Sequence, residues 1–124
     1  MKGMIWNCEY VEWNYPTVHK HLDDCLLIFI CFESGDTEEK LDDAIRRINQ
    51  LDRKRFNRKG AVVFPYAHLS HEIMPIKEAT IFFEKFGTAS KKDFEHVEEL
   101  PFNKDKNVEI DLRPKAEDVS FFEY

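Results

Sequence analysis

The chain has 124 residues, of which 43% are hydrophobic and 34% charged, and its net charge is −6. This length suits one domain, and the apolar content is too high for a disordered chain. The acidic balance excludes a broad electrostatic surface for nucleic acid, so a polynucleotide partner would need a local basic cluster or delivery by another protein. One basic cluster follows a predicted helix, and a solvated helix end is its alternative interpretation: Arg46, Arg47, Arg53, Lys54, Arg55, Arg58 and Lys59.

The cysteines, Cys8, Cys25 and Cys31, are odd in number and form no CxxC pair. This pattern predicts neither a disulfide framework nor a structural zinc site. The first residues lack the apolar core of a signal peptide, and the longest apolar run, residues 25–32, is too short to span a membrane. We therefore expect a cytoplasmic protein with no membrane partner.

The first half of the chain predicts a strand, a second strand and a helix. Residues 3–13 mix β-branched and aromatic side chains in rough alternation, which is typical of a strand with one wet face. A polar connection is expected up to Asp24, and the apolar run 25–32 predicts a central strand. Asp36 and Glu39 resemble a capping box that opens a helix. The helix has one apolar stripe, formed by Leu41, Ala44, Ile45, Ile48 and Leu51.

The second half completes an α/β domain. Residues 61–64 predict a third strand, parallel to the second because a helix connects the two. Pro75 can open a second helix, which ends at Gly87 or continues to about residue 92. Residues 96–102 and 107–112 predict two more strands, with a turn or strand start at 104–106 between them. The expected fold is a single α/β domain, residues 1–112, with a mixed sheet of about five strands and two helices, followed by a loosely held tail, residues 113–124.

The stretch GAVVFPYAHLSHEI, residues 60–73, ends the third strand in an unusual corner. Pro65 can simply end a strand at an edge. However, ligands in open α/β sheets bind beyond the carboxyl ends of parallel strands, which makes His68 a candidate site residue. Both interpretations remain open at this level.

Other catalytic patterns receive little support. His68 and His71 form an HxxH pair, but no further ligand follows at a recognised metal spacing, so surface histidines are the favoured interpretation. The same holds for the group His19, His21, Asp23 and Cys25. The chain has no glycine-rich phosphate loop, no GxSxG and no HExxH, and Cys31 has no base near it in sequence. We expect no metal and no cofactor.

The run VVFPYAHLS, residues 62–70, closely resembles the strand-to-loop motif of the archaeal threonyl-tRNA synthetase editing domain. The similarity extends in order through Tyr10-Val11-Glu12, the strand ending Phe32-Glu33, the charged helix, and Pro101-Phe102 followed by Lys106. It covers roughly residues 1–112. Asn103-Lys104-Asp105 stands where the family has Gly-Tyr-Tyr, so Asp105 occupies the place of a pocket tyrosine.

This resemblance implies a D-aminoacyl-tRNA deacylase-like fold, assembled as a homodimer. It also implies hydrolysis of the ester in mischarged seryl-tRNA(Thr), as a freestanding trans-editing enzyme that meets the 3′ end of aminoacyl-tRNA. Such a second site raises fidelity because binding alone discriminates poorly between substrates that differ by one methyl group. A separate threonyl-tRNA synthetase is a further candidate partner.

Carried over residue by residue, the resemblance implies a catalytic role for Lys106 and His68. Lys106 would be the cation near the developing oxyanion, and the terminal ribose hydroxyl of the tRNA would assist. The implied substrate-binding residues are Pro65, Tyr66, Ala67, Phe32, Phe102 and Asp105, with the two phenylalanines as apolar walls. Phe32 replaces a smaller aliphatic residue of the family, which predicts a narrower pocket. The alternative function is a non-catalytic module that binds an amino acid, a tRNA end or a synthetase.

Overall fold

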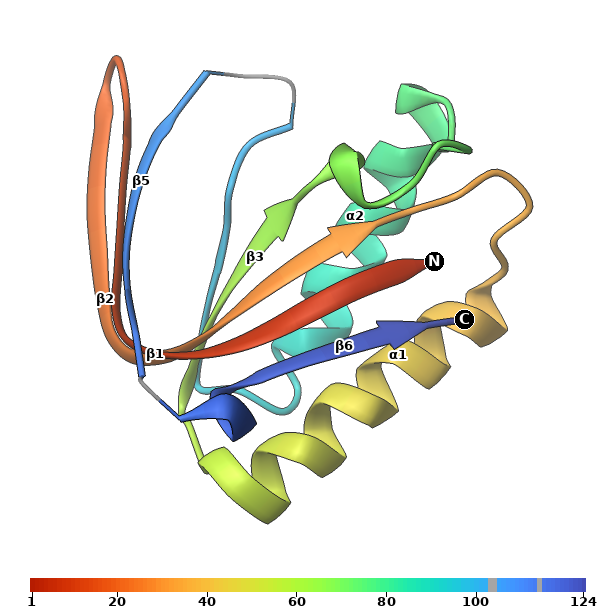
Figure 1. Ribbon diagram of the computed structural model, residues 1–124. Coiled ribbons are helices and arrows are strands. Elements are labelled where there is room, and N and C mark those ends of the chain that lie inside the picture. Colours follow the sequence, from red (N-terminus) through yellow and green to blue (C-terminus); the bar gives the residue numbers. More distant parts are fainter. Residues whose placement is uncertain (103–104, 114) are drawn as a thin grey trace.

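The computed structural model describes residues 1–102, 105–113 and 115–124. One mixed sheet has the strand order β4-β3-β2-β1-β5, with β6 also pairing with β1. Both long helices lie on the same side of this sheet (Figure 1). The single α/β domain with two helices is therefore confirmed, and the sheet has one strand more than expected. Among the described residues, no helix is both long and apolar enough to cross a membrane.

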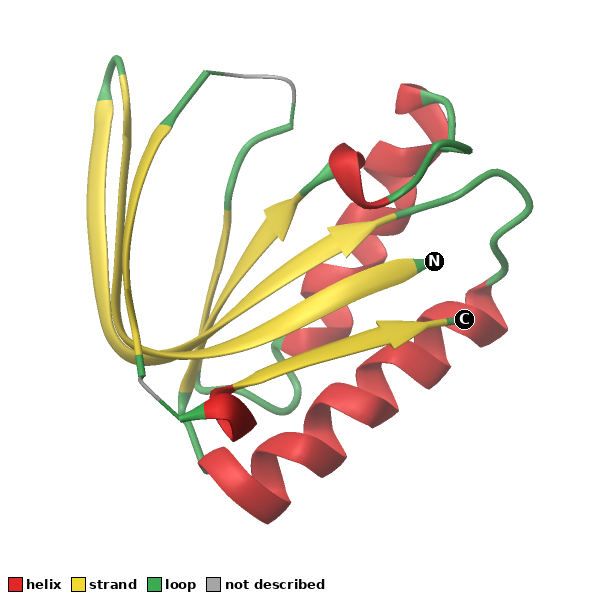
Figure 2. Cartoon of the chain, in the orientation of Figure 1, coloured by secondary structure: helices red, strands yellow, loops and turns green. Residues whose placement is uncertain are grey.

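The first two strands form a long antiparallel hairpin, β1 (Lys2–Tyr15) and β2 (Val18–Cys31). The prediction of a polar connection up to Asp24 is wrong, because residues 18–24 are the first half of β2. They pair with β1 from Tyr15↔Val18 to Tyr10↔Asp23, and most of their side chains are exposed. The sheet curls strongly here, so the hairpin tip rises from the rest of the sheet (Figure 2). Backbone pairing holds this segment without an apolar pattern.

A helix connects β2 to β3, as the sequence predicts. The helix α1 (Glu38–Leu51) begins after Thr37, whose side chain accepts a hydrogen bond from the backbone N–H of Lys40. The N-cap is thus Thr37 and not Asp36, whose carboxylate binds other groups. A π-helical turn, Asp52–Phe56, extends the helix, and β3 (Gly60–Pro65) then pairs parallel with β2. The parallel strand–helix–strand prediction is confirmed.

The second helix, α2 (Ile76–Ser90), follows Pro75, which is the N-cap residue rather than the first helical residue. The helix continues through Gly87, so the longer of the two expected ends is correct. The strand β4 (His96–Glu99) is shorter than predicted, whereas β5 (Asn107–Leu112) has the predicted bounds. The turn expected at 104–106 lies partly outside the described residues.

A sixth strand, β6 (Val119–Glu123), follows a short 3₁₀ turn at Ala116–Asp118. It pairs antiparallel with the first residues of β1, from Lys2↔Glu123 to Trp6↔Val119. Phe122 is buried beside the helices, and Asp118 accepts a hydrogen bond from Asn7 at 2.8 Å. Where a loosely held tail is expected, residues 119–123 are a paired edge strand.

Apolar side chains fill both faces of the sheet. The cluster between sheet and helices contains Ile28, Ile30, Val63 and the inward faces of α1 and α2. The opposite face carries Leu27, Phe29 and Val62, over which the curled hairpin and β5 fold. β2 is central to both clusters, which explains its uninterrupted apolar run. Its carboxyl end lies beside that of β3, and this edge positions the candidate site.

Candidate functional site

A cavity of about 680 Å³ opens beyond the carboxyl ends of β2 and β3. Four segments line it: the end of β2 with Ser34, the end of β3 with the loop to His68, residues 73–79 before and within α2, and the segment that carries Phe102, Asp105 and Lys106. Because the crossover makes β2 and β3 parallel, both strands deliver their last residues to this one edge.

The first wall of the cavity is the loop after β3, and hydrogen bonds hold it to β2. The N–H of Tyr66 donates to the Ile30 carbonyl at 2.9 Å, which continues the sheet beyond Pro65. The N–H of Met74 donates to the Phe32 carbonyl at 3.0 Å. Between them, Ala67–Leu69 form one 3₁₀ turn, and the His68 ring packs edge-on against Tyr66 with centroids 5.3 Å apart. The loop is thus fastened at both ends.

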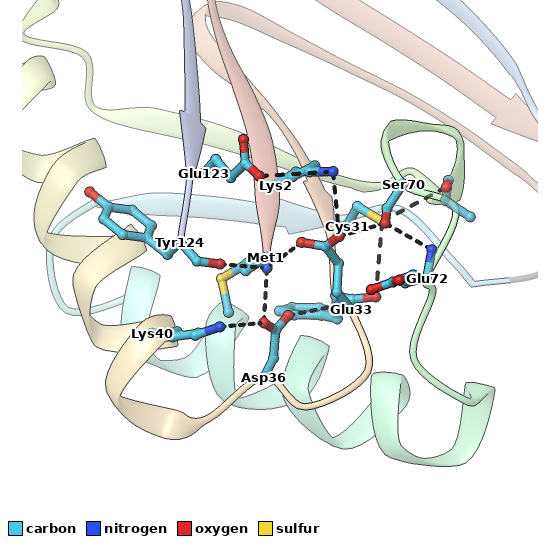
Figure 3. A network of polar contacts seen from close by, with 12 residues as sticks. Met1, Lys2, Cys31, Glu33, Asp36, Lys40, Ser70, Glu72, Glu123 and Tyr124 are labelled. Atoms are coloured by element: carbon cyan, nitrogen blue, oxygen red, sulfur yellow. Dashed lines mark hydrogen bonds and ion pairs between the residues drawn. The ribbon is translucent and has the colours of Figure 1, made fainter.

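A network of hydrogen bonds and ion pairs connects this loop, through Ser70, to Glu33 and the N-terminus (Figure 3). The Ser70 hydroxyl donates to one Glu33 carboxylate oxygen at 2.5 Å, and the α-amino group of Met1 donates to the other at 2.7 Å. That amino group also donates to Asp36 at 2.8 Å. Burial alone would raise the pKa of Glu33, but these two hydrogen bonds and the charge of Lys2 outweigh it and lower the pKa to about 2. The network therefore holds Glu33 as a carboxylate.

The second wall carries Lys106. Its ammonium donates to the Pro101 carbonyl at 3.0 Å and lies 5.1 Å from the centroid of the Phe64 ring, in cation–π geometry. Burial lowers the pKa of Lys106 below its usual value, and the negative charge of Asp105 partly opposes this effect. The cavity wall thus carries a partly desolvated cation.

The two phenylalanines predicted as apolar walls line the cavity, but both also belong to the packing against α2. Phe32 is 4% exposed, and its ring lies 5.7 Å from Phe82 and 6.5 Å from Phe86, between centroids. Phe102 packs edge-on against Phe83 at 4.8 Å. Phe32 therefore belongs both to the cavity lining and to the core, and the narrower pocket predicted from it stays a prediction.

Cys31 also lines the cavity, although its thiol is not suited to attack. It is 3% exposed, and its sulfur lies 3.8 Å from the Ala67 carbonyl oxygen. Burial is the largest cause that raises the pKa of this thiol, and the nearby Glu33 charge adds to it. Because the thiolate is the nucleophilic form, the geometry gives Cys31 a packing role at the cavity floor.

All eight residues named from the sequence line this one cavity: Phe32, Pro65, Tyr66, Ala67, His68, Phe102, Asp105 and Lys106. Their roles in binding or catalysis stay predictions. Sequence reasoning missed the lining residues that precede and open α2: Ile73, Met74, Pro75, Ile76 and Ala79. A signal for them exists, because a helix that follows a strand's carboxyl end begins near that edge.

The other candidate groups lie elsewhere. His19 and His21 are on the exposed half of β2, where both approach Glu12, at 3.0 and 3.8 Å. No group of three or more His, Cys, Asp or Glu side chains among the described residues is arranged to hold a metal ion. The basic cluster surrounds the π-helical turn just before β3, at the end of the sheet opposite the cavity (Figure 1).

Solved structures define the class of fold. The chain superimposes with a TM-score of 0.82 on a structure titled "c-Myc DNA Unwinding Element Binding Protein", at 13% identity over 100% of this chain and 99% of that one. A probable eukaryotic D-amino acid tRNA deacylase follows, with a TM-score of 0.75, 10% identity and coverage of 98% and 97%. The architecture is that of the D-aminoacyl-tRNA deacylase-like folds.

Sequence comparison narrows the class to a family. Residues 4–116 match the archaea-specific editing domain of threonyl-tRNA synthetase, and the chain belongs to this family. It is also similar to the threonine–tRNA ligase of Methanococcus aeolicus, with 28% identity over 125 aligned positions. That match covers 91% of this chain and 20% of the ligase, so the chain spans about one fifth of its relative's length.

Proposed function

We propose that this protein hydrolyses the ester bond of mischarged aminoacyl-tRNA, with seryl-tRNA(Thr) as its substrate. The observation that carries the proposal is the meeting of the Pro65–His68 corner and Lys106 around one cavity. These two parts of the family motif are about 40 residues apart in sequence, and only the fold brings them together. Membership of an editing-domain family supports the same reaction.

The chemistry asks little of the protein, because an aminoacyl ester is already activated. Water adds to the carbonyl carbon, the bond from that carbon to the ribose oxygen breaks, and the ribose oxygen leaves with a proton. The products are the free amino acid and the tRNA with its hydroxyl restored. The ammonium of Lys106 would stabilise the negative charge that develops on the carbonyl oxygen. His68 and the terminal ribose hydroxyl would help to place the water and move its proton.

The decisive experiment follows ester loss from Ser-tRNA(Thr). We expect the protein to accelerate hydrolysis, and Lys106→Ala to reduce kcat by about 100-fold, the usual cost of removing one oxyanion-stabilising group. Lys92→Ala is the matched control, because Lys92 is exposed beyond the far end of α2. No acceleration, or equal rates for the wild type and Lys106→Ala, would refute the catalytic proposal.

A non-catalytic binding module is the second candidate. One observation favours it: the Lys106 ammonium already donates to the Pro101 carbonyl. Such a module would bind an amino acid, a tRNA end or a synthetase. Calorimetry with serine, threonine and D-amino acids distinguishes it, since binding without any hydrolysis of Ser-tRNA(Thr) is its signature.

We also propose that the protein acts in the cytoplasm as a homodimer and meets the 3′ end of aminoacyl-tRNA, with a separate threonyl-tRNA synthetase as a further partner. Among the described strands β6 pairs only with β1, and its Phe121 is 53% exposed, which supports this edge as a contact for a second copy. Sedimentation equilibrium measures the assembly directly. A monomer at micromolar concentration would remove the dimer from the proposal.

A further inference from the structure

We propose that Asp105 binds the protonated α-amino group of the substrate, so that the site selects acyl groups with a free ammonium and rejects N-acylated or peptidyl ones. The inference rests on the proposed function, because it places an aminoacyl ester in the cavity. It makes Asp105 a specificity residue of this chain.

The charges around the cavity match the two ends of an aminoacyl ester. Among the lining residues that the structure describes, Asp105 is the only carboxylate and Lys106 the only ammonium or guanidinium group. An aminoacyl ester has a positive α-amino group and a carbonyl oxygen that becomes negative during hydrolysis, only a few bonds apart. Two adjacent residues of opposite charge therefore suit the two groups at once.

Asp105 is available for this role. Its side chain is exposed, and no hydrogen bond or ion pair joins its carboxylate to any residue that the structure describes. It also lines a second cavity, beside the hairpin tip with Tyr15 and His19, so it lies on the partition between the two spaces. A carboxylate at this rim can accept hydrogen bonds from a ligand without first breaking a contact within the described chain.

The other oxygen- or nitrogen-bearing side chains of the described lining belong to Ser34, Tyr66 and His68, and none of them is a carboxylate. Phe32, Met74 and Ala79 are buried apolar side chains, and the Ser34 hydroxyl already donates to the Ile73 carbonyl at 3.3 Å. An ammonium placed against such a surface without a partner would pay a large desolvation cost. Asp105 removes that cost for a free amine, whereas an N-acyl group would leave the carboxylate covered and unpaired.

The test uses two stable adenosine analogues bound to the purified protein in a calorimeter. The first is 3′-amino-3′-deoxyadenosine carrying a seryl group in amide linkage. The second carries 3-hydroxypropanoyl, which lacks only the α-amino group. We expect the wild type to bind the seryl analogue about tenfold more tightly than its des-amino partner, in line with a hydrogen bond to a charged group. Asp105→Asn should abolish this ratio, and Asp105→Glu should restore most of it.

The control is Glu84→Gln, which removes an exposed carboxylate of α2 outside the cavity and should leave the ratio unchanged. Equal affinity of the wild type for both analogues would overturn the inference. So would an Asp105→Asn variant that weakens both analogues equally, because that pattern reports a structural role. Failure of the wild type to bind either analogue would overturn it as well.

Hydrolysis of Ser-tRNA(Thr), measured in parallel, separates this inference from the proposed function. If Ser-tRNA(Thr) is hydrolysed but the seryl and des-amino analogues bind equally well, the proposed hydrolase function stands and the proposed role of Asp105 is refuted. If the preference for the seryl analogue depends on Asp105 but Ser-tRNA(Thr) is not hydrolysed, the proposed recognition by Asp105 stands and the proposed hydrolase function is refuted. N-acetylseryl-tRNA(Thr) gives a second readout, since we expect at least a fivefold higher KM than for Ser-tRNA(Thr) in the wild type and equal values in Asp105→Asn.

Discussion

The two walls of the cavity are built in different ways. The loop from Pro65 to Met74 is joined at one end to Ile30 in β2 and at the other to Phe32 just after it, and the Ser70–Glu33 hydrogen bond supports it. The described part of the opposite wall is held by the Lys106–Pro101 hydrogen bond and by packing of Phe102 against Phe83. Hydrogen bonds and the charges around Glu33 secure the first wall, whereas the second wall presents the partly desolvated Lys106 ammonium to the cavity.

Lys106→Met should most clearly separate the catalytic charge of the second wall from the stability of the fold. Hydrolysis of Ser-tRNA(Thr) is expected to fall by about 100-fold, because the oxyanion loses its cation. Stability in urea should be unchanged or higher, since burial disfavours the ammonium, as its lowered pKa indicates. Steady-state kinetics and equilibrium unfolding on the same preparation measure both. A large loss of stability would mean that this wall, too, supports the fold.

Glu33→Gln, in the support of the first wall, should mainly reduce the stability of the fold. A pKa of about 2, compared with an ordinary 4.5, corresponds to at most about 3 kcal/mol of stability. Because the pKa of this carboxyl is depressed on folding, the contribution is complete above about pH 4.5 and is lost as the pH falls toward 2. We expect the variant to be less stable at pH 7 and to lose much of the wild type's acid sensitivity in that window.

Urea unfolding between pH 2 and pH 7 measures this effect, with Glu84→Gln as the control carboxylate on an exposed helix face. Identical pH profiles for Glu33→Gln and the wild type would show that the network around Met1 and Ser70 contributes nothing to the fold. The comparison between the two walls would then lose its basis.

The same contrast explains how much could be predicted from the sequence. The strand–helix–strand unit and the corner at Pro65 were predictable, because long apolar runs and a helical stripe are local signals. The resemblance to the family added Lys106, which no local pattern connects to His68. The first half of β2 is mostly polar and β6 is short, so neither has a clear local strand signal. Both were missed because they become strands through pairing with β1, which is a non-local contact.

Two side chains that local patterns describe incompletely, Asp36 and Phe32, share a physical cause. Asp36 fits a helix cap by sequence, yet its carboxylate binds the Met1 amino group and the N–H of Glu33, and Thr37 caps the helix. Phe32 is predicted from its sequence position as a cavity wall, and its ring also packs among the phenylalanines of α2. In both cases a partner far away in sequence decides where the side chain points, and local patterns do not report such partners.

Phe102→Ala tests how far the second wall depends on packing. The half-buried ring meets Phe83 edge-on at 4.8 Å, so its removal should cost about 2 kcal/mol of unfolding free energy. Phe121→Ala, at a ring that is 53% exposed, should cost less than about 1 kcal/mol. Urea unfolding measures both variants. If Phe102→Ala is no more destabilising than Phe121→Ala, the Phe83 contact does not hold this wall in place.

Ser70→Ala should give the smallest effect, and it isolates how the first wall is supported. The variant removes the hydroxyl that donates to Glu33 and also accepts from the N–H of Glu72 at 3.0 Å. A hydrogen bond to a partly buried carboxylate is worth about 1–2 kcal/mol, and the loop keeps its backbone bonds to β2. We therefore expect the free energy of unfolding to fall by about 1 kcal/mol. The KM for Ser-tRNA(Thr) should rise about threefold with kcat nearly unchanged, because the loop shapes the pocket and takes no part in the reaction.

Thr88→Ala, at an exposed position of α2, is the control. A fall in kcat with an unchanged KM would contradict this view, since it would place Ser70 in the chemical step itself.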